Sequence, residues 1–74
     1  MTTSFNITLN GQPHSIQAGT TLADLLSAVR PDLDLSKAAL ATAVNGRHVA
    51  RTARTACMLQ PDDQITTFEP ISGG

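Results

Sequence analysis

Apolar and polar residues alternate along the start of the chain, and this alternation predicts two strands. In SFNITL every second residue is apolar and would lie on one face of a half-buried strand: Phe5, Ile7 and Leu9. Asn10-Gly11 follows, and both residue types tolerate the positive φ angles of a tight turn. A second alternating run, HSIQA, comes next. Residues 1–18 are therefore expected to form a β-hairpin.

After Gly19 the period changes to that of a helix. In TTLADLLSAV the apolar residues recur at i, i+3, i+4 and i+7, which is one stripe of an α-helix: Leu22, Leu25, Leu26 and Val29. Thr21 and Asp24 have the spacing of a capping box at its start. Arg30-Pro31 should end the helix, because the residue before a proline is disfavoured in the helical region.

Three shorter strands are expected in the second half of the chain. AALATAVN and RHVAR flank a second Asn-Gly pair and predict another hairpin, although the alanines of the first run also favour helix. Residues 52–59 are expected to be irregular, with Met58 and Leu59 in the core. QPDDQ predicts a turn, and ITTFE is the last strand, which Pro70 ends.

This order of elements predicts a two-layer α+β fold, a mixed sheet of four to five strands packed on one main helix. The last strand is expected to pair in parallel with the first at the centre of the sheet, and the crossover through the helix should be right-handed. We divide the chain into a domain of residues 1–71 and a flexible tail of residues 72–74.

Composition restricts the class of protein. The chain has 74 residues, 41% of them hydrophobic, which suits one small globular core and is too apolar for disorder. A net charge of −1 argues against nucleic-acid binding, and no apolar run approaches the roughly 20 residues that span a bilayer. A single cysteine excludes an internal disulfide and suits a reducing compartment. We expect a cytoplasmic protein that is a monomer when free.

Several motifs in this order resemble one family. The strand–strand–helix–strand layout, AVNG leading to VAR, then LQPDDQI and a final Gly73-Gly74, is similar to the ubiquitin-like β-grasp sulfur carriers. Within them it most resembles the ThiS type of thiamin (thiazole) biosynthesis. The resemblance covers nearly the whole chain and implies the β-grasp fold.

The resemblance also implies a chemistry. The Gly74 carboxylate would be adenylated by a ubiquitin-activating-type enzyme that uses ATP and Mg²⁺. Sulfur from a cysteine desulfurase relay would convert it to a thiocarboxylate, and a thiazole synthase would accept that sulfur. The chain itself would be no enzyme, with no catalytic residue, metal or bound cofactor of its own.

The resemblance assigns roles to the last residues. Gly74 is the reacting group, and Gly73 gives access because a backbone without Cβ atoms can pass through a narrow channel. The docking residues would be Ser72, Ile71 and Pro70, with Phe68 in the same apolar patch. The alternative is an ordinary frayed terminus, where disorder usually concentrates.

The chain departs from the family pattern at two places. Many relatives have Asp-Gly-Asp where this chain has Pro61-Asp62-Asp63. If the turn keeps a positive φ, Asp62 must adopt it, which Asp tolerates better than most residues. An aromatic residue often found shortly after the VAR element is missing, and Ala56 or Cys57 lies nearby.

The other polar residues leave alternatives open. Cys57 is either a sulfur-relay thiol or a small buried hydrophobe, and a lone Cys beside Met-Leu is more often the latter. His14 and His48 are ordinary strand residues rather than metal ligands, because no second ligand motif accompanies them. Three arginines form either a solvated face, the favoured interpretation, or an edge that meets an acidic partner: Arg47, Arg51 and Arg54.

Other functions compete with the thiazole carrier. FEPISGG also resembles the small subunit of molybdopterin synthase, but residues 31–38 are too few for the extra helix usual in that family. A non-catalytic β-grasp interaction module, or a modifier whose Gly74 is joined to lysines, is another class. An enzyme is least supported, because no titratable residues converge in the sequence pattern.

Overall fold

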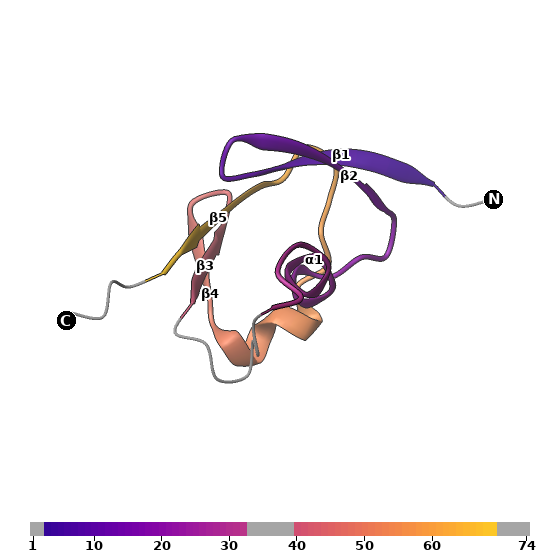
Figure 1. Cartoon of the computed structure of the whole chain (residues 1–74). Helices are drawn as coiled ribbons and strands as arrows, with labels where there is room; N and C mark the ends of the chain where they lie inside the picture. The colour runs from indigo at the N-terminus through magenta and orange to yellow at the C-terminus, as the bar shows by residue number, and fades with distance from the viewer. Residues whose placement is uncertain (1–2, 33–39, 70–74) are drawn as a thin grey trace.

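The structure is a computed structural model of the chain, and it describes residues 3–32 and 40–69 (Figure 1). Five described strands form one mixed sheet in the order β2-β1-β5-β3-β4. Their bounds are β1 Ser4–Leu9, β2 Gln12–Gln17, β3 Ala41–Val44, β4 Arg47–Val49 and β5 Gln64–Phe68. The helices are α1, Leu22–Val29, and the 3-10 helix η1, Arg51–Ala56. The predicted α+β class is confirmed, with α1 lying within the curve of the sheet (Figure 1).

The two Asn-Gly pairs form the turns of the two predicted hairpins. β1 and β2 pair antiparallel up to Leu9 and Gln12, and Asn10 has a φ of 51°. Asn45 has a φ of 53° in the corresponding turn between β3 and β4. Both asparagines occupy the left-handed region that these tight turns require.

The last strand lies at the centre of the sheet, as predicted. β5 pairs in parallel with β1, with Thr8 opposite Gln64 and Leu9 opposite Ile65. On its other edge it pairs antiparallel with β3, where Ala41 lies opposite Phe68. β5 therefore has neighbours on both sides, and it is the last described strand.

The start and end of α1 follow the sequence signals. The Asp24 N–H donates to Thr21 Oγ1 at 3.1 Å, and the Thr21 N–H donates to Asp24 Oδ2 at 3.2 Å, which is a complete capping box. At the other end the Arg30 N–H donates to the Leu26 carbonyl oxygen at 2.8 Å. The helix then ends before Pro31, as predicted.

The core is aliphatic and lies between α1 and the sheet. Its buried members are Ile7, Leu22, Leu25, Leu26, Leu40, Leu59 and Ile65. The prediction for Leu59 is confirmed, whereas the prediction that Met58 fills the core is wrong, because Met58 is 57% exposed. The segment is extended here and pairs with Thr21, so consecutive side chains point to opposite sides.

The segment after β4 differs from its prediction. Residues 52–59 were expected to be irregular, but η1 covers most of them. Arg54, expected on a solvated face, is buried: its Nε donates to Thr42 Oγ1 at 3.1 Å and its Nη2 donates to the Leu40 carbonyl oxygen. No described residue accepts a hydrogen bond from its Nη1. Desolvation and then the charge of Arg51 lower the pKa of Arg54.

No helix in residues 3–32 and 40–69 combines the length and apolar content needed to cross a membrane. The predicted boundary between a domain and a tail, at residues 71 and 72, lies outside the described residues and stays a prediction.

Candidate functional site at the end of β5

The described residues nearest to the predicted reactive group are those at the end of β5. Five of the six predicted site residues lie outside the described part of the chain: Pro70, Ile71, Ser72, Gly73 and Gly74. The sixth, Phe68, is the last residue of β5. The candidate site can therefore be described at its base, where the chain leaves the sheet.

Phe68 has the exposure that a docking residue requires. It is 59% exposed, although it is a large apolar side chain in a paired strand. Its neighbour Thr67 lines the cavity between the sheet and α1, so the alternation of a strand directs Phe68 to the opposite, outer face. An exposed aromatic side chain thus lies on the outer face of the sheet, two residues before Pro70.

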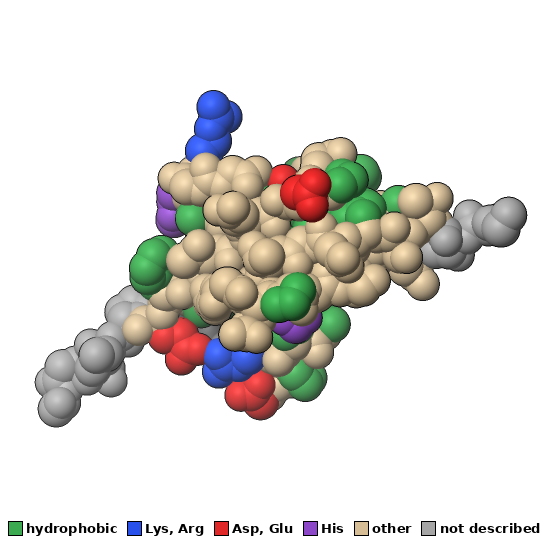
Figure 2. All heavy atoms as spheres, turned by 90° about the horizontal axis from the view of Figure 1, so that it is seen from above, with side chains coloured by type: hydrophobic (Ala, Val, Ile, Leu, Met, Phe, Trp, Pro, Cys, Tyr) green, Lys and Arg blue, Asp and Glu red, His purple; other side chains and the backbone are tan. Residues whose placement is uncertain are grey.

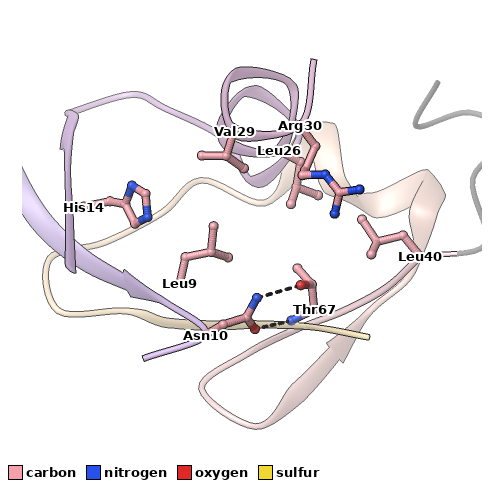
Figure 3. Close-up of a pocket in the computed structure, with 8 residues that line it drawn as sticks. All are labelled: Leu9, Asn10, His14, Leu26, Val29, Arg30, Leu40 and Thr67. Carbon is pink, nitrogen blue, oxygen red and sulfur yellow. Dashed lines mark hydrogen bonds between the residues drawn. The ribbon is translucent and has the colours of Figure 1, made fainter. Parts of the chain in front are cut away.

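Asn10 holds the end of β5 from the hairpin turn. The Thr67 N–H donates to Asn10 Oδ1 at 2.9 Å, and Asn10 Nδ2 donates to Thr67 Oγ1 at 2.9 Å (Figure 3). β1 ends at Leu9, so no backbone of that strand lies beside Thr67. The amide of Asn10 therefore replaces a strand neighbour at this point.

An ion pair joins the end of α1 to the residue after β5. Arg30 Nη1 pairs with Glu69 Oε1, and Arg30 Nε lies 3.5 Å from Asp32 Oδ1. The hydrogen bond with Glu69, and then that with Asp32, raises the pKa of Arg30. Charged side chains are sparse on the face shown in Figure 2. Near one edge of this face a basic side chain (blue) lies between acidic side chains (red).

A cavity of about 210 Å³ lies beside this ion pair, between α1 and the sheet (Figure 3). Half of its lining residues are aliphatic and the others are polar: Leu9, Asn10, His14, Leu26, Val29, Arg30, Leu40 and Thr67. The lining has no carboxylate or thiol, and it shows no nucleophile beside a general base.

Cys57 and the histidines have the environments of structural residues. Cys57 is half-buried and packs against the core, which agrees with its interpretation as a small hydrophobe. Burial, and then the charge of Asp63, raise the pKa of the Cys57 thiol. His14 lines the cavity and His48 is exposed on β4. Among the described residues no group of three or more potential ligands could hold a metal ion.

Comparison with known proteins identifies the family. The model of the ThiS family matches residues 7–74. The chain belongs to the ThiS family. The crystal structure of a thiamine biosynthesis protein (ThiS) from Geobacter metallireducens aligns with a TM-score of 0.73 at 25% identity, covering 95% of this chain and 100% of that one. The prediction of a ThiS-type sulfur carrier with the ubiquitin-like β-grasp fold is confirmed.

A second relative of this ThiS-family chain is longer. A protein from Magnetococcus marinus named "Thiazole synthase" is 41% identical over 68 residues, which are 92% of this chain and 20% of that protein. The chain therefore spans about a fifth of the length of this curated relative.

The turn where this ThiS-family chain departs from the Asp-Gly-Asp pattern keeps a positive φ. Asp62 has a φ of 66°, which confirms that it adopts the conformation that Gly would adopt more easily. Its N–H donates to the Asn6 carbonyl oxygen at 2.8 Å, so the turn is attached to β1. At the other departure, η1 buries Arg54, whereas Ala56 is exposed and Cys57, just after η1, is half-buried.

Sequence reasoning missed two contributions to the site. Asn10 was interpreted as a turn residue alone, and its bond to Thr67 depends on the parallel pairing of β1 with β5. Arg30 was interpreted as the end of the helix, and 39 residues separate it from Glu69. Neither contact leaves a local signal in the sequence.

Proposed function

We propose that the chain carries sulfur for thiazole formation in thiamin biosynthesis on the carboxylate of Gly74. The observation that carries this proposal is the match to the ThiS family model, which extends through residue 74. The described geometry supports it, because a central strand ends in an exposed aromatic residue beside the predicted tail. The described residues present docking surface, and the catalytic groups come from the partners.

The proposed chemistry begins with activation of the carboxylate. A carboxylate resists attack by a nucleophile until one of its oxygens becomes part of a good leaving group. An oxygen of Gly74 therefore attacks the α-phosphorus of ATP, and pyrophosphate leaves. A ubiquitin-activating-type enzyme supplies the ATP and Mg²⁺ site. The terminal sulfur of a persulfide, which a cysteine desulfurase relay supplies, then displaces AMP and forms an acyl disulfide. A thiol attacks the outer sulfur of this acyl disulfide and forms a disulfide with it, and the thiocarboxylate leaves.

A thiazole synthase is the proposed acceptor. The protein named "Thiazole synthase" contains a region that is 41% identical to this chain, and such a region would place a carrier beside its acceptor. The ThiS family match favours this branch over the small subunit of molybdopterin synthase.

Intact mass spectrometry tests the proposal. The chain ending at Gly74 is incubated with a ThiS-activating enzyme, ATP, Mg²⁺, cysteine desulfurase and cysteine. We expect a species about 16 Da heavier, because sulfur replaces one oxygen. A chain without Gly74 is the matched control and should stay unmodified. An unmodified chain, in a reaction that converts a known ThiS protein, would overturn the proposal, and an isopeptide product would indicate a modifier.

The acceptor is tested separately. The thiocarboxylate form is offered to a thiazole synthase and, in parallel, to the large subunit of molybdopterin synthase. Loss of the added mass with the first enzyme alone supports the thiazole branch. Loss with the second alone would assign the carrier to molybdenum cofactor synthesis instead.

A further inference from the structure

Support for β5 decreases toward its end. β1 pairs with it as far as Leu9 and Ile65, and the Asn10 side chain then holds Thr67. β3 pairs with it as far as Phe68. Glu69 lies one residue beyond these ladders, and its side chain is paired with Arg30.

Arg30 is well fixed for holding Glu69. Its backbone N–H bonds to the last turn of α1, and Pro31 follows with a φ restricted by its ring. The guanidinium is a planar fork with several donors, so it can meet two carboxylates at once. Here Nε faces Asp32 while Nη1 meets Glu69, which joins the helix layer to the base of the tail.

The pair also fixes the orientation of the strand end. Along β5, Thr67 faces the cavity and Phe68 is on the outer side. Glu69 lies beyond the strand, and its bond to Arg30 directs its side chain toward the end of α1. The ion pair therefore holds Glu69 toward α1, at the point where the described chain ends. A segment that is oriented before it binds loses less conformational entropy on binding.

We propose that the ion pair between Arg30 and Glu69 fixes the end of β5 at the last described residue, and that Arg30 is a positioning residue for the reaction of Gly74. This inference rests on the proposed function. Since adenylation occurs in the partner's site, loss of the pair should weaken productive binding of the chain and leave the chemical step unchanged. The effect should appear in KM and not in kcat.

A double-mutant cycle tests this inference. Arg30→Gln, Glu69→Gln and the double variant are compared in adenylation by a ThiS-activating enzyme at low ionic strength. Each single variant should raise the KM for the chain about two- to fivefold, the size expected for an exposed ion pair, with kcat unchanged. The double variant should be no worse than either single one, because the same interaction is lost. Asp62→Asn is the matched control, because it also removes one exposed carboxylate charge, and it should leave KM unchanged.

Two further measurements separate positioning from a general loss of structure. Arg30→Lys keeps the charge and should recover part of the KM. At roughly 1 M salt the Debye length is about 3 Å, so the wild-type KM should approach that of the variants. Melting temperatures should agree closely across the set.

Amide ¹⁵N relaxation measures how rigidly the backbone at the end of β5 is held, and it needs no enzyme. The order parameters of Phe68 and Glu69 should fall in Arg30→Gln and not in Asp62→Asn. Unchanged order parameters and KM in Arg30→Gln and Glu69→Gln, or equal effects of Asp62→Asn, would overturn the inference. If the order parameters fall as expected while the wild-type chain is never adenylated, the positioning stands and the proposed function fails.

Discussion

The side chain of Asn10 acts as a strand neighbour for Thr67, accepting from its N–H and donating to its hydroxyl, each at 2.9 Å. Asn45 does the same at the other end of β5, where the Gln64 N–H donates to Asn45 Oδ1 at 2.9 Å. Each asparagine thus forms a tight turn with its backbone and extends the pairing of the central strand with its side chain. Both ends of the strand that leads to the tail are held in this way.

Replacing Asn10 should separate its two contributions. Asn10→Gly keeps the positive φ and loses the amide, and it should lower the free energy of unfolding by about 1 kcal/mol. Asn10→Ala loses the amide and also strains the left-handed backbone, so it should cost about 2 kcal/mol. Urea denaturation of both variants measures the difference. Equal losses would mean that the φ angle contributes nothing.

Substitutions at Arg54 should show what its burial contributes. Arg54→Met retains most of the side-chain volume and removes a buried charge, so its free energy of unfolding should stay within about 1 kcal/mol of the wild type. Arg54→Ala leaves a cavity and should cost about 2 to 4 kcal/mol. Chemical denaturation compares them. A methionine variant as unstable as the alanine variant would show that the bonds to Thr42 and Leu40 dominate.

The turn at Asp62 offers a stabilising substitution. Its φ of 66° is easier for Gly than for any other residue, so Asp62→Gly should raise the free energy of unfolding by up to about 1 kcal/mol. Asp62→Ala should be less stable than Asp62→Gly by about 1 kcal/mol. Asp62→Asn is the control and should be neutral, since Asn also tolerates this conformation. Thermal melts of the wild type and the three variants in one buffer measure these differences in stability. A glycine variant that is less stable than the wild type would contradict the prediction.

Cys57 should make stability depend on pH in the alkaline range. Burial raises the pKa of its thiol above the ordinary value of 9.0, so the native state holds the proton more tightly than the unfolded state. The contribution is complete below pH 9.0 and is lost as the pH rises through the native pKa. The free energy of unfolding should therefore fall over this window, which no tyrosine complicates because the chain has none. Cys57→Ala should reduce the fall, and an equal fall in both proteins would assign it elsewhere.

Phe68 should matter for the partner more than for stability. Because it is 59% exposed, Phe68→Ala should cost less than about 1 kcal/mol in folding. In adenylation assays it should raise the KM for the chain severalfold. Met58→Ala is a matched control, since Met58 is 57% exposed and lies beside the start of α1. Equal effects of the two substitutions on KM would remove Phe68 from the docking surface.

Local signals determined the described elements except η1, in a segment expected to be irregular. Alternation gave the strands of the first hairpin, the helical stripe and capping box gave α1, and Asn-Gly pairs gave both turns. The two-layer fold followed because one helix can cover only one face of a sheet, and the predicted parallel pairing of the last strand with the first is confirmed. These features depend on residues within a few positions of one another, or on the order of the elements.

Only the tertiary structure decided which polar side chains meet. Arg54 is buried and Met58 exposed, although charge and hydropathy alone suggest the reverse. Asn10 meets Thr67, and Arg30 meets Glu69, because the sheet places β5 beside the hairpin turn and its end near the end of α1. The physical reason is that a side-chain contact between distant segments depends on strand register and helix position. Those are set by packing of the whole core, not by any local pattern.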